Sequence, residues 1–326
     1  MKKLVCSTKI LLLLFPNDRS MKFYPALIIV MIFSFLNPEH RVSNDLLDAG
    51  QEQKPLFSFG VFADAQYCDC EPSGSRHFRS SLEKLKEAMT SMKKSNPAFI
   101  INLGDLIDKD FASFDPMLEV IKNSGIKVYH VAGNHDFSVE EKQKKRVRPL
   151  LGLKKGYYSF THDQFRFIVL DGNEISTYGT TNNTVKKQAS ELIKKLEAEG
   201  EPNAMDWNGS ISSGQILWLK NQLDSSINEK QKVFIICHFP VWPQNEHNLL
   251  NYREVTATIQ PYDNIVAWFS GHNHAGNYGN ANMKHFVNFK GMVETEDLNS
   301  FAIVEVYRNK IWKKGYGREK SMILAY

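Results

Sequence analysis

The sequence predicts an α/β fold in which two packed mixed β-sheets are flanked by helices. Three observations lead to this prediction. Short apolar runs alternate with amphipathic helical patterns over residues 56–131, which is typical of parallel strands joined by crossover helices. Further strand patterns continue toward the carboxyl terminus. Short polar blocks, several of them beginning with glycine, stand where predicted strands would turn into loops.

The first half of the fold is predicted from five segments. Residues 56–63 alternate and are rich in Phe and Val, as a strand is. A helix follows, with one apolar face formed at steps of four and three residues by Phe78, Leu82, Leu85, Met89 and Met92. Asn96-Pro97 ends this helix. A short buried strand over 98–103, a helix over 116–123 that stops near Gly125 and a strand over 127–131 complete the pattern.

The second half begins with a predicted hairpin of residues 157–160 and 165–170. A charged amphipathic helix is expected over 185–197, and the capping-box spacing of Ser212 and Gln215 marks the start of another. The remaining predicted strands are 233–237, 265–269, 287–289, 301–307 and 311–314. The basic run 142–148 is expected to be a solvated helix face rather than a phosphate clamp.

The amino terminus has the pattern of a targeting segment. If Met21 is the initiator, Lys22 forms a basic region and residues 26–36 an apolar one that is too short to span a membrane. We expect residues 1–36 to be a signal or targeting segment, 37–55 a linker and 56–326 the folded domain. The protein is then exported, periplasmic or extracellular. One alternative is that the segment is retained as a membrane anchor. The other is a cytoplasmic protein with neither a signal peptide nor an anchor.

Composition and cysteine usage narrow the function classes. A net charge of +4, from 40 basic and 36 acidic residues, gives no support for bulk nucleic-acid binding. The four cysteines do not imply a disulfide framework. Cys68 and Cys70 lie too close for an easy bridge within a strand, so we expect free thiols there, with a redox pair or a soft-metal site as alternatives. Cys237 is expected in the core.

Five short polar blocks recur in a fixed order, and four of them follow a strand-like apolar run. They are Asp64-Ala65-Gln66, Gly104-Asp105, Gly133-Asn134-His135-Asp136, Cys237-His238 and Gly271-His272-Asn273-His274. Each residue alone is weak, because Asp and Asn are also common turn residues. The ordered set is far more specific, because it aims carboxylate, amide and imidazole groups from several strands at one point.

These blocks supply the candidate metal ligands Asp64, Gln66, Asp105, Asn134, His238, His272 and His274. Asp105 can bridge two ions, because a carboxylate has two oxygens. Residues i and i+2 of an extended chain face the same way, which pairs Asp64 with Gln66 and His272 with His274. Oxygen and nitrogen ligands without thiolate favour Mn²⁺, Mg²⁺, Fe²⁺ or Zn²⁺.

Such a ligand set suits a two-metal hydrolase that acts on phosphate esters or anhydrides. Two divalent cations about 3.5–4 Å apart can clamp phosphoryl oxygens and activate water. His135 follows Asn134 and points elsewhere, so we assign it to the developing charge or the leaving oxygen. Asp136 is expected to orient His135, as a carboxylate fixes an imidazole tautomer.

The five blocks resemble those of the calcineurin-like metallophosphoesterases, over nearly all of residues 56–326. The resemblance implies a four-layer sandwich with a dinuclear metal site at strand ends. Most members carry His two residues after the first Asp, where this chain has Gln66. Further segments are similar to the Mn²⁺-dependent ADP-ribose/CDP-alcohol diphosphatases, namely residues 59–66, 157–160, 207–209, 251–253, 293–295 and 315–318.

The resemblance also implies how the ligands divide between two metal ions. One ion would be held by Asp64, Gln66, Asp105 and His274, and the other by Asp105, Asn134, His238 and His272. An amide oxygen is a harder and weaker ligand than imidazole, so Gln66 favours Mn²⁺ over Zn²⁺. Asp108 stands where purple acid phosphatases have an iron-binding tyrosine, so we do not expect that enzyme type.

The expected activity is hydrolysis of nucleoside diphosphate-X compounds to a nucleoside monophosphate and phospho-X. Tyr252 is a candidate to stack on the base, and Arg253 or Arg79 to bind the distal phosphate. Another phosphoesterase on the same fold, either a cyclic-nucleotide phosphodiesterase or a broad phosphomonoesterase, is the main alternative. A catalytically silent metal-binding or interaction protein is the third.

The expected partner is a small nucleotide, without nucleic acid, and with membrane contact only through an uncleaved amino-terminal segment. We expect a monomer.

Overall fold

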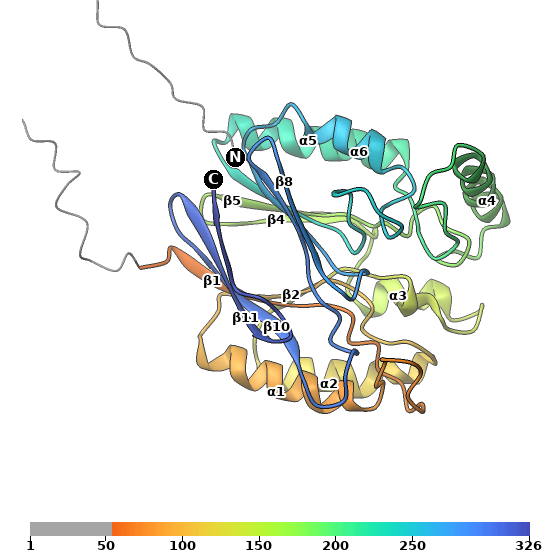
Figure 1. The fold of residues 1–326 in the computed structure, drawn as a ribbon, viewed down its shortest axis with the longest axis horizontal. Helices are drawn as coiled ribbons and strands as arrows, with labels where there is room; N and C mark the ends of the chain where they lie inside the picture. Colours follow the sequence, from red (N-terminus) through yellow and green to blue (C-terminus); the bar gives the residue numbers. More distant parts are fainter. Residues whose placement is uncertain (1–53) are drawn as a thin grey trace, which may run out of the picture. The chain divides into compact units, whose positions relative to one another are not determined.

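In the computed structural model, which describes residues 54–326, the strands form two six-stranded sheets (Figure 1). The first sheet has the order β12-β11-β10-β1-β2-β3. Its strands are β1 (Phe57–Phe62), β2 (Ile100–Asn102), β3 (Val128–His130), β10 (Ser300–Val306), β11 (Lys310–Gly317) and β12 (Met322–Ala325). The first three are parallel to one another, and the last three pair antiparallel.

The second sheet has the order β4-β5-β6-β7-β9-β8. Its strands are β4 (Tyr158–His162), β5 (Phe165–Val169), β6 (Lys232–Ile236), β7 (Ile265–Ser270), β8 (Asn277–Ala281) and β9 (Lys284–Asn288). Four central strands are parallel, and β4 and β8 are antiparallel edges. The carboxyl ends of β6 and β7 therefore point the same way, which brings the segments after them together.

Helices cover the outer face of each sheet (Figure 1). The first sheet is covered by α1 (Ser80–Lys94) and α2 (Phe114–Ser124), and the second by α5 (Ser213–Asn228) and α6 (Tyr252–Ile259). The other helices are α3 (Lys144–Leu150), α4 (Asn183–Ala198) and the 3₁₀ turns η2 (Phe111–Ser113) and η3 (His135–Phe137).

The main core lies between the two sheets. Phe59 of the first sheet packs edge-to-face on Phe167 and Phe234 of the second, with ring centroids 5.5 and 5.7 Å apart. Burial of such rings is the main force that joins the sheets. The predicted fold of two packed mixed sheets with flanking helices is thus confirmed.

The residues predicted to start or end helices mostly do so. Ser212 caps α5 by accepting a hydrogen bond from the Gln215 amide, and Gly125 ends α2 in the left-handed conformation. No sequence pattern predicted α6, β8 or β12. The basic run 142–148 was predicted to be a solvated helix face. This is true only in part, because Arg148 pairs with Asp171 and lies over the Phe137 ring.

The expectation of free thiols at Cys68 and Cys70 was wrong, because these residues form a disulfide. The bridge was doubted on the assumption of a strand. Their segment is instead a loop that follows Gln66, and its bend brings the two Cα atoms to 5.2 Å. Cys237 is a free buried cysteine, as expected.

The amino-terminal predictions, a signal or targeting segment over 1–36 and most of the linker over 37–55, fall outside the described residues. Within residues 54–326, no helix has both the length and the apolar character needed to cross a membrane.

Candidate metal centre

The polar blocks lie just beyond the carboxyl ends of parallel strands in both sheets. Asp64 follows β1 and Asp105 follows β2, whereas Asn134 comes after β3. His238 follows β6, and the block with His272 follows β7. Because the strand ends of both sheets meet at this edge, groups that are far apart in sequence come together.

One half of the cluster joins Asp105 to two imidazoles. The potential ligand atoms of Asp105, His238 and His272 all lie within 4.8 Å of one another, and the three residues are buried. His238 Nε2 is 3.3 Å from Asp105 Oδ2 and 3.1 Å from Asn134 Oδ1. Buried carboxylate, amide and imidazole groups at this spacing suit a divalent cation.

The other half of the cluster contacts the same Asp105 carboxylate. Gln66 Nε2 is 3.2 Å from Asp105 Oδ2 and 3.1 Å from His274 Nε2, which is itself 3.6 Å from Asp64 Oδ1. Gln66 Oε1 is buried without a hydrogen-bond partner. A half-turn of the amide would present this oxygen to the cluster, as a metal ligand requires. Asp105 is therefore shared by both halves.

Each of the three imidazoles is held by a second group outside the cluster. His238 Nδ1 lies 2.9 Å from the Leu103 carbonyl oxygen. His272 Nε2 lies 2.9 Å from Asn208 Oδ1, and His274 Nδ1 lies 2.7 Å from Glu294 Oε1. Such partners fix the tautomer and the ring orientation of metal-binding histidines, so the residues present fit a metal site.

The backbone of the cluster differs from the extended geometry assumed in the sequence analysis. Four candidate ligands have positive φ, namely Asp64 (52°), Gln66 (46°), Asp105 (54°) and His272 (69°). Left-handed backbone is uncommon for residues other than glycine and concentrates at functional sites. Sharp turns after the strands, rather than alternation along a strand, bring the paired side chains together.

Two glycines allow the backbone to approach the carboxylates closely. A Cβ atom at Gly133 would lie 2.1 Å from Asp105 Oδ1, and one at Gly271 would lie 2.6 Å from Asp64 Oδ2. Any larger residue at either position would push a candidate ligand away.

Replacement of Gly133 by alanine is expected to reduce metal content and turnover together, because the new methyl group must displace the Asp105 carboxylate. Metal content after dialysis and initial rates measure the effect. Gly125→Ala is a useful comparison, because a Cβ there meets no atom within 4 Å and its positive φ affects only the end of α2. Full metal content in Gly133→Ala would contradict this description of the cluster.

His135 lies beside the cluster, and its orienting group is Asp108 rather than Asp136. His135 Nδ1 makes a short contact with Asp108 Oδ1. The Asp136 carboxylate instead accepts hydrogen bonds from the backbone N–H groups of Asp105, Leu106, Ile107 and Gly133. The predicted role of Asp136 was wrong, because its place in η3 turns the carboxylate toward these amides. Asp136 fixes the loop that carries Asp105.

Burial and neighbouring charges both shift the pKa values of residues in the cluster. Burial acts to raise the pKa of Asp105, but the charges of His238 and His135 hold it well below its usual range. Burial lowers the pKa of His238, yet Asp105 outweighs it and raises that pKa to about 9. Burial and the charge of His238 lower the pKa of His272. Because a ligating imidazole must be neutral, His238 would have to lose its proton to hold a metal ion.

The cluster opens into a cavity of about 390 Å³. Besides candidate ligands and His135, its wall contains Arg76, Trp207 and His247. None of these three residues was predicted to line the site. Trp207 lies in a segment noted only for its similarity to a family, and no sequence signal distinguished Arg76 from other surface arginines.

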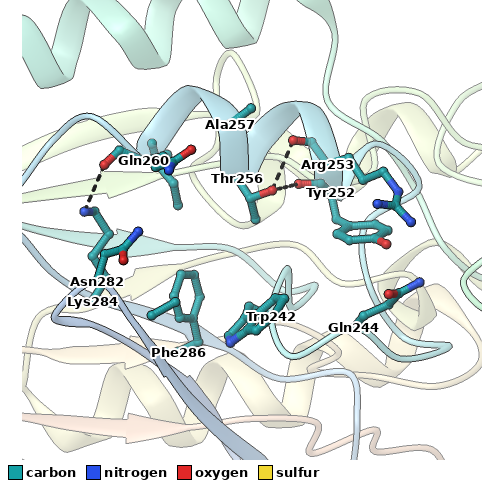
Figure 2. A pocket seen from close by; sticks show the side chains of 12 residues that line it. Trp242, Gln244, Tyr252, Arg253, Thr256, Ala257, Gln260, Asn282, Lys284 and Phe286 are labelled. Carbon is teal, nitrogen blue, oxygen red and sulfur yellow. Dashed lines mark hydrogen bonds between the residues drawn. The ribbon is translucent and has the colours of Figure 1, made fainter.

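The three predicted substrate-binding residues do not line this cavity. Arg79 forms exposed ion pairs with Asp69 and Glu71. Tyr252 and Arg253 line a separate pocket beside α6 (Figure 2).

The fold and the buried carboxylate–imidazole cluster define a class of enzyme, the metallophosphoesterases. The model of the calcineurin-like phosphoesterase family matches residues 57–276, and the chain belongs to this family. It is a metal-dependent hydrolase.

Several relatives carry one particular name, manganese-dependent ADP-ribose/CDP-alcohol diphosphatase. The Xenopus laevis protein is 28% identical, over 86% of this chain and 94% of the relative. The human protein is 29% identical over 83% and 93%, and the Arabidopsis thaliana protein 28% over 82% and 97%. The crystal structure of a dimetal phosphatase from Danio rerio shares the fold, with a TM-score of 0.77 and 22% identity over 84% of this chain and all of that chain.

Proposed function

We propose that this protein hydrolyses the phosphoanhydride bond of nucleoside diphosphate-X compounds, such as ADP-ribose and CDP-alcohols. The products are a nucleoside monophosphate and phospho-X. The observation that carries the proposal is the buried cluster around Asp105, to which both halves of the ligand set are joined. Relatives named as ADP-ribose/CDP-alcohol diphosphatases, which match most of the chain, support the substrate class.

The proposal includes two divalent cations that share Asp105. One would be held by Asp64, Gln66, Asp105 and His274, and the other by Asp105, Asn134, His238 and His272. When bound, the ions stabilise charge on the phosphoryl oxygens and supply a nucleophile from water at neutral pH. Manganese is supported by the oxygen-rich donor set, with amides from Gln66 and Asn134, and by the names of the relatives.

The chain's own residues position the substrate and stabilise charge. Asp108 holds His135 at Nδ1, which leaves Nε2 for the leaving oxygen or the developing charge in the cavity. A phosphomonoester leaving group has a second pKa of about 6 and needs little protonation, so His135 acts mainly on charge. Arg76 can bind the distal phosphate, and the exposed ring of Trp207 can stack on the base.

Arg76→Ala is expected to raise KM for ADP-ribose about tenfold or more, because a charge-assisted hydrogen bond to phosphate is lost. Steady-state kinetics give KM and kcat separately. The matched control is Arg79→Ala, three residues away, which removes only exposed ion pairs with Asp69 and Glu71. Equal KM changes in the two variants would contradict the role of Arg76.

Product identification tests the proposed reaction. The manganese-loaded protein is incubated with CDP-choline, ADP-ribose, cyclic AMP and p-nitrophenyl phosphate, and the products are separated by chromatography. CMP with phosphocholine, or AMP with ribose phosphate, is the expected result. Turnover of cyclic AMP or the aryl phosphate alone would favour the alternative phosphoesterase activities.

We further propose that the protein is exported. The Cys68–Cys70 disulfide supports this proposal, because disulfides persist in oxidising compartments. Amino-terminal sequencing of the mature protein is expected to show a start beyond residue 36. A mature chain that keeps residues 21–36 would contradict cleavage.

A further inference from the structure

A second pocket, which we call the α6 pocket, lies between α6, the segment around Trp242 and the β8–β9 turn (Figure 2). Its volume is about 370 Å³, within the range of small-molecule sites. It shares no lining residue with the cavity of the metal cluster. Figure 2 shows Trp242 and Phe286 along one side and α6 along the other.

The wall opposite α6 is aromatic. Trp242 is 42% exposed, although its large indole ring would gain from burial, and Phe286 beside it is buried. Figure 2 shows both rings in the same wall of the pocket. An aromatic wall of this kind favours a planar ring as ligand, because stacked rings attract beyond the area they bury.

One end of the pocket presents amide groups. Gln260 at the end of α6 and Asn282 in the β8–β9 turn both line it (Figure 2). Within residues 54–326, neither side-chain amide is engaged in a hydrogen bond. Each amide offers donors and acceptors together, which match the edge of a nitrogen heterocycle.

The other end carries the Arg253 guanidinium, which an ion pair with Glu201 holds in place. Glu201, whose side chain is largely buried, accepts hydrogen bonds from Gln244, Tyr252 and Arg253. Arg253 uses one nitrogen for this contact and lies over the Tyr252 ring, 5.3 Å from its centroid. The remaining guanidinium N–H groups are available for an anion, and their planar arrangement suits phosphate.

We propose that the α6 pocket is a noncatalytic binding site for a nucleoside monophosphate. The base stacks on Trp242, with Gln260 and Asn282 near its edge, and the phosphate meets Arg253. Binding here requires no metal-cluster residue, so the inference is independent of the proposed reaction. It also gives Arg253 a place in nucleotide binding that differs from the one expected from the sequence.

Calorimetric titration of the manganese-loaded full-length protein with AMP tests this proposal. Trp242→Ala is expected to weaken one AMP site about tenfold or more, as loss of base stacking does. The matched control is Trp207→Ala, because Trp207 is 40% exposed but lines the metal-cluster cavity. Trp207→Ala is expected to leave the affinity of the α6 pocket for AMP unchanged. Identical titrations of wild-type protein and Trp242→Ala would overturn the proposal.

Arg253→Ala tests the phosphate end separately. This variant is expected to lose the preference of the α6 pocket for AMP over adenosine while it keeps adenosine affinity. Ribose 5-phosphate is the opposite probe, and binding as tight as that of AMP would overturn the stacking role of Trp242. Thermal unfolding checks that each variant is folded. Failure to cleave ADP-ribose, with the AMP site intact, would remove the proposed function alone.

Discussion

Asp105→Asn is expected to reduce turnover of ADP-ribose at least about a thousandfold and to lower the metal content of the protein. Asp105 is the carboxylate that both halves of the cluster share, at 3.3 Å from His238 and 3.2 Å from Gln66. Asparagine keeps the size of the side chain and an acceptor for the His135 amide, now 2.7 Å from Asp105 Oδ1. Only the charge and the second ligand oxygen are lost. Initial rates and elemental analysis of dialysed protein measure the two effects.

Asp115→Asn is the matched control for this variant, because Asp115 is an exposed carboxylate in the first turn of α2. It is expected to keep both activity and metal. An Asp105→Asn protein with wild-type metal content and rate would mean that the cluster is not the reaction centre.

His135→Ala is expected to lower kcat by about 10²–10⁴, the range of general acid–base and charge-stabilising groups, with metal content unchanged. The reason is positional. His135 lines the cavity and is held by Asp108, outside the seven candidate ligands. Its loss therefore removes a group that acts on the substrate while the ligand set remains.

Asp108→Asn extends this test to the positioning residue. We expect a smaller loss of kcat, about 10- to 100-fold, because the imidazole is present but no longer held in one orientation. A control at His162, which packs on Phe57 at the far end of β4, should leave kcat unchanged. If His135→Ala loses metal in proportion to its rate, His135 belongs to the metal site and its assigned role is wrong.

The sequence predicted the architecture well because the polar blocks coincide with strand ends. Asp64 and Asp105 could be placed at one edge of a sheet as soon as β1 and β2 were recognised as parallel strands. Local signals such as Ser212 and Gln215 fixed helix starts without tertiary information. Strand β8, which was not predicted, has a polar residue or glycine at three of its five positions and no apolar alternation. Hydrophobic periodicity therefore could not reveal it.

Partners that lie far apart in the sequence could not be predicted in the same way. Asp136 adjoins His135, yet Asp108, 27 residues earlier, is the group that contacts the imidazole. Arg76 and Arg79 belong to one short segment, and only the fold shows that Arg76 lines the cavity. The Cys68–Cys70 disulfide likewise depends on a bend that the strand assumption excluded.

Anomalous diffraction from crystals of the manganese-loaded protein tests the central claim most directly. The expected result is two manganese peaks about 3.5–4 Å apart, one on either side of the Asp105 carboxylate. Gln66 and His274 should lie beside one peak, and His238 and His272 beside the other. Manganese bound elsewhere, or absent around Asp105, would contradict the account.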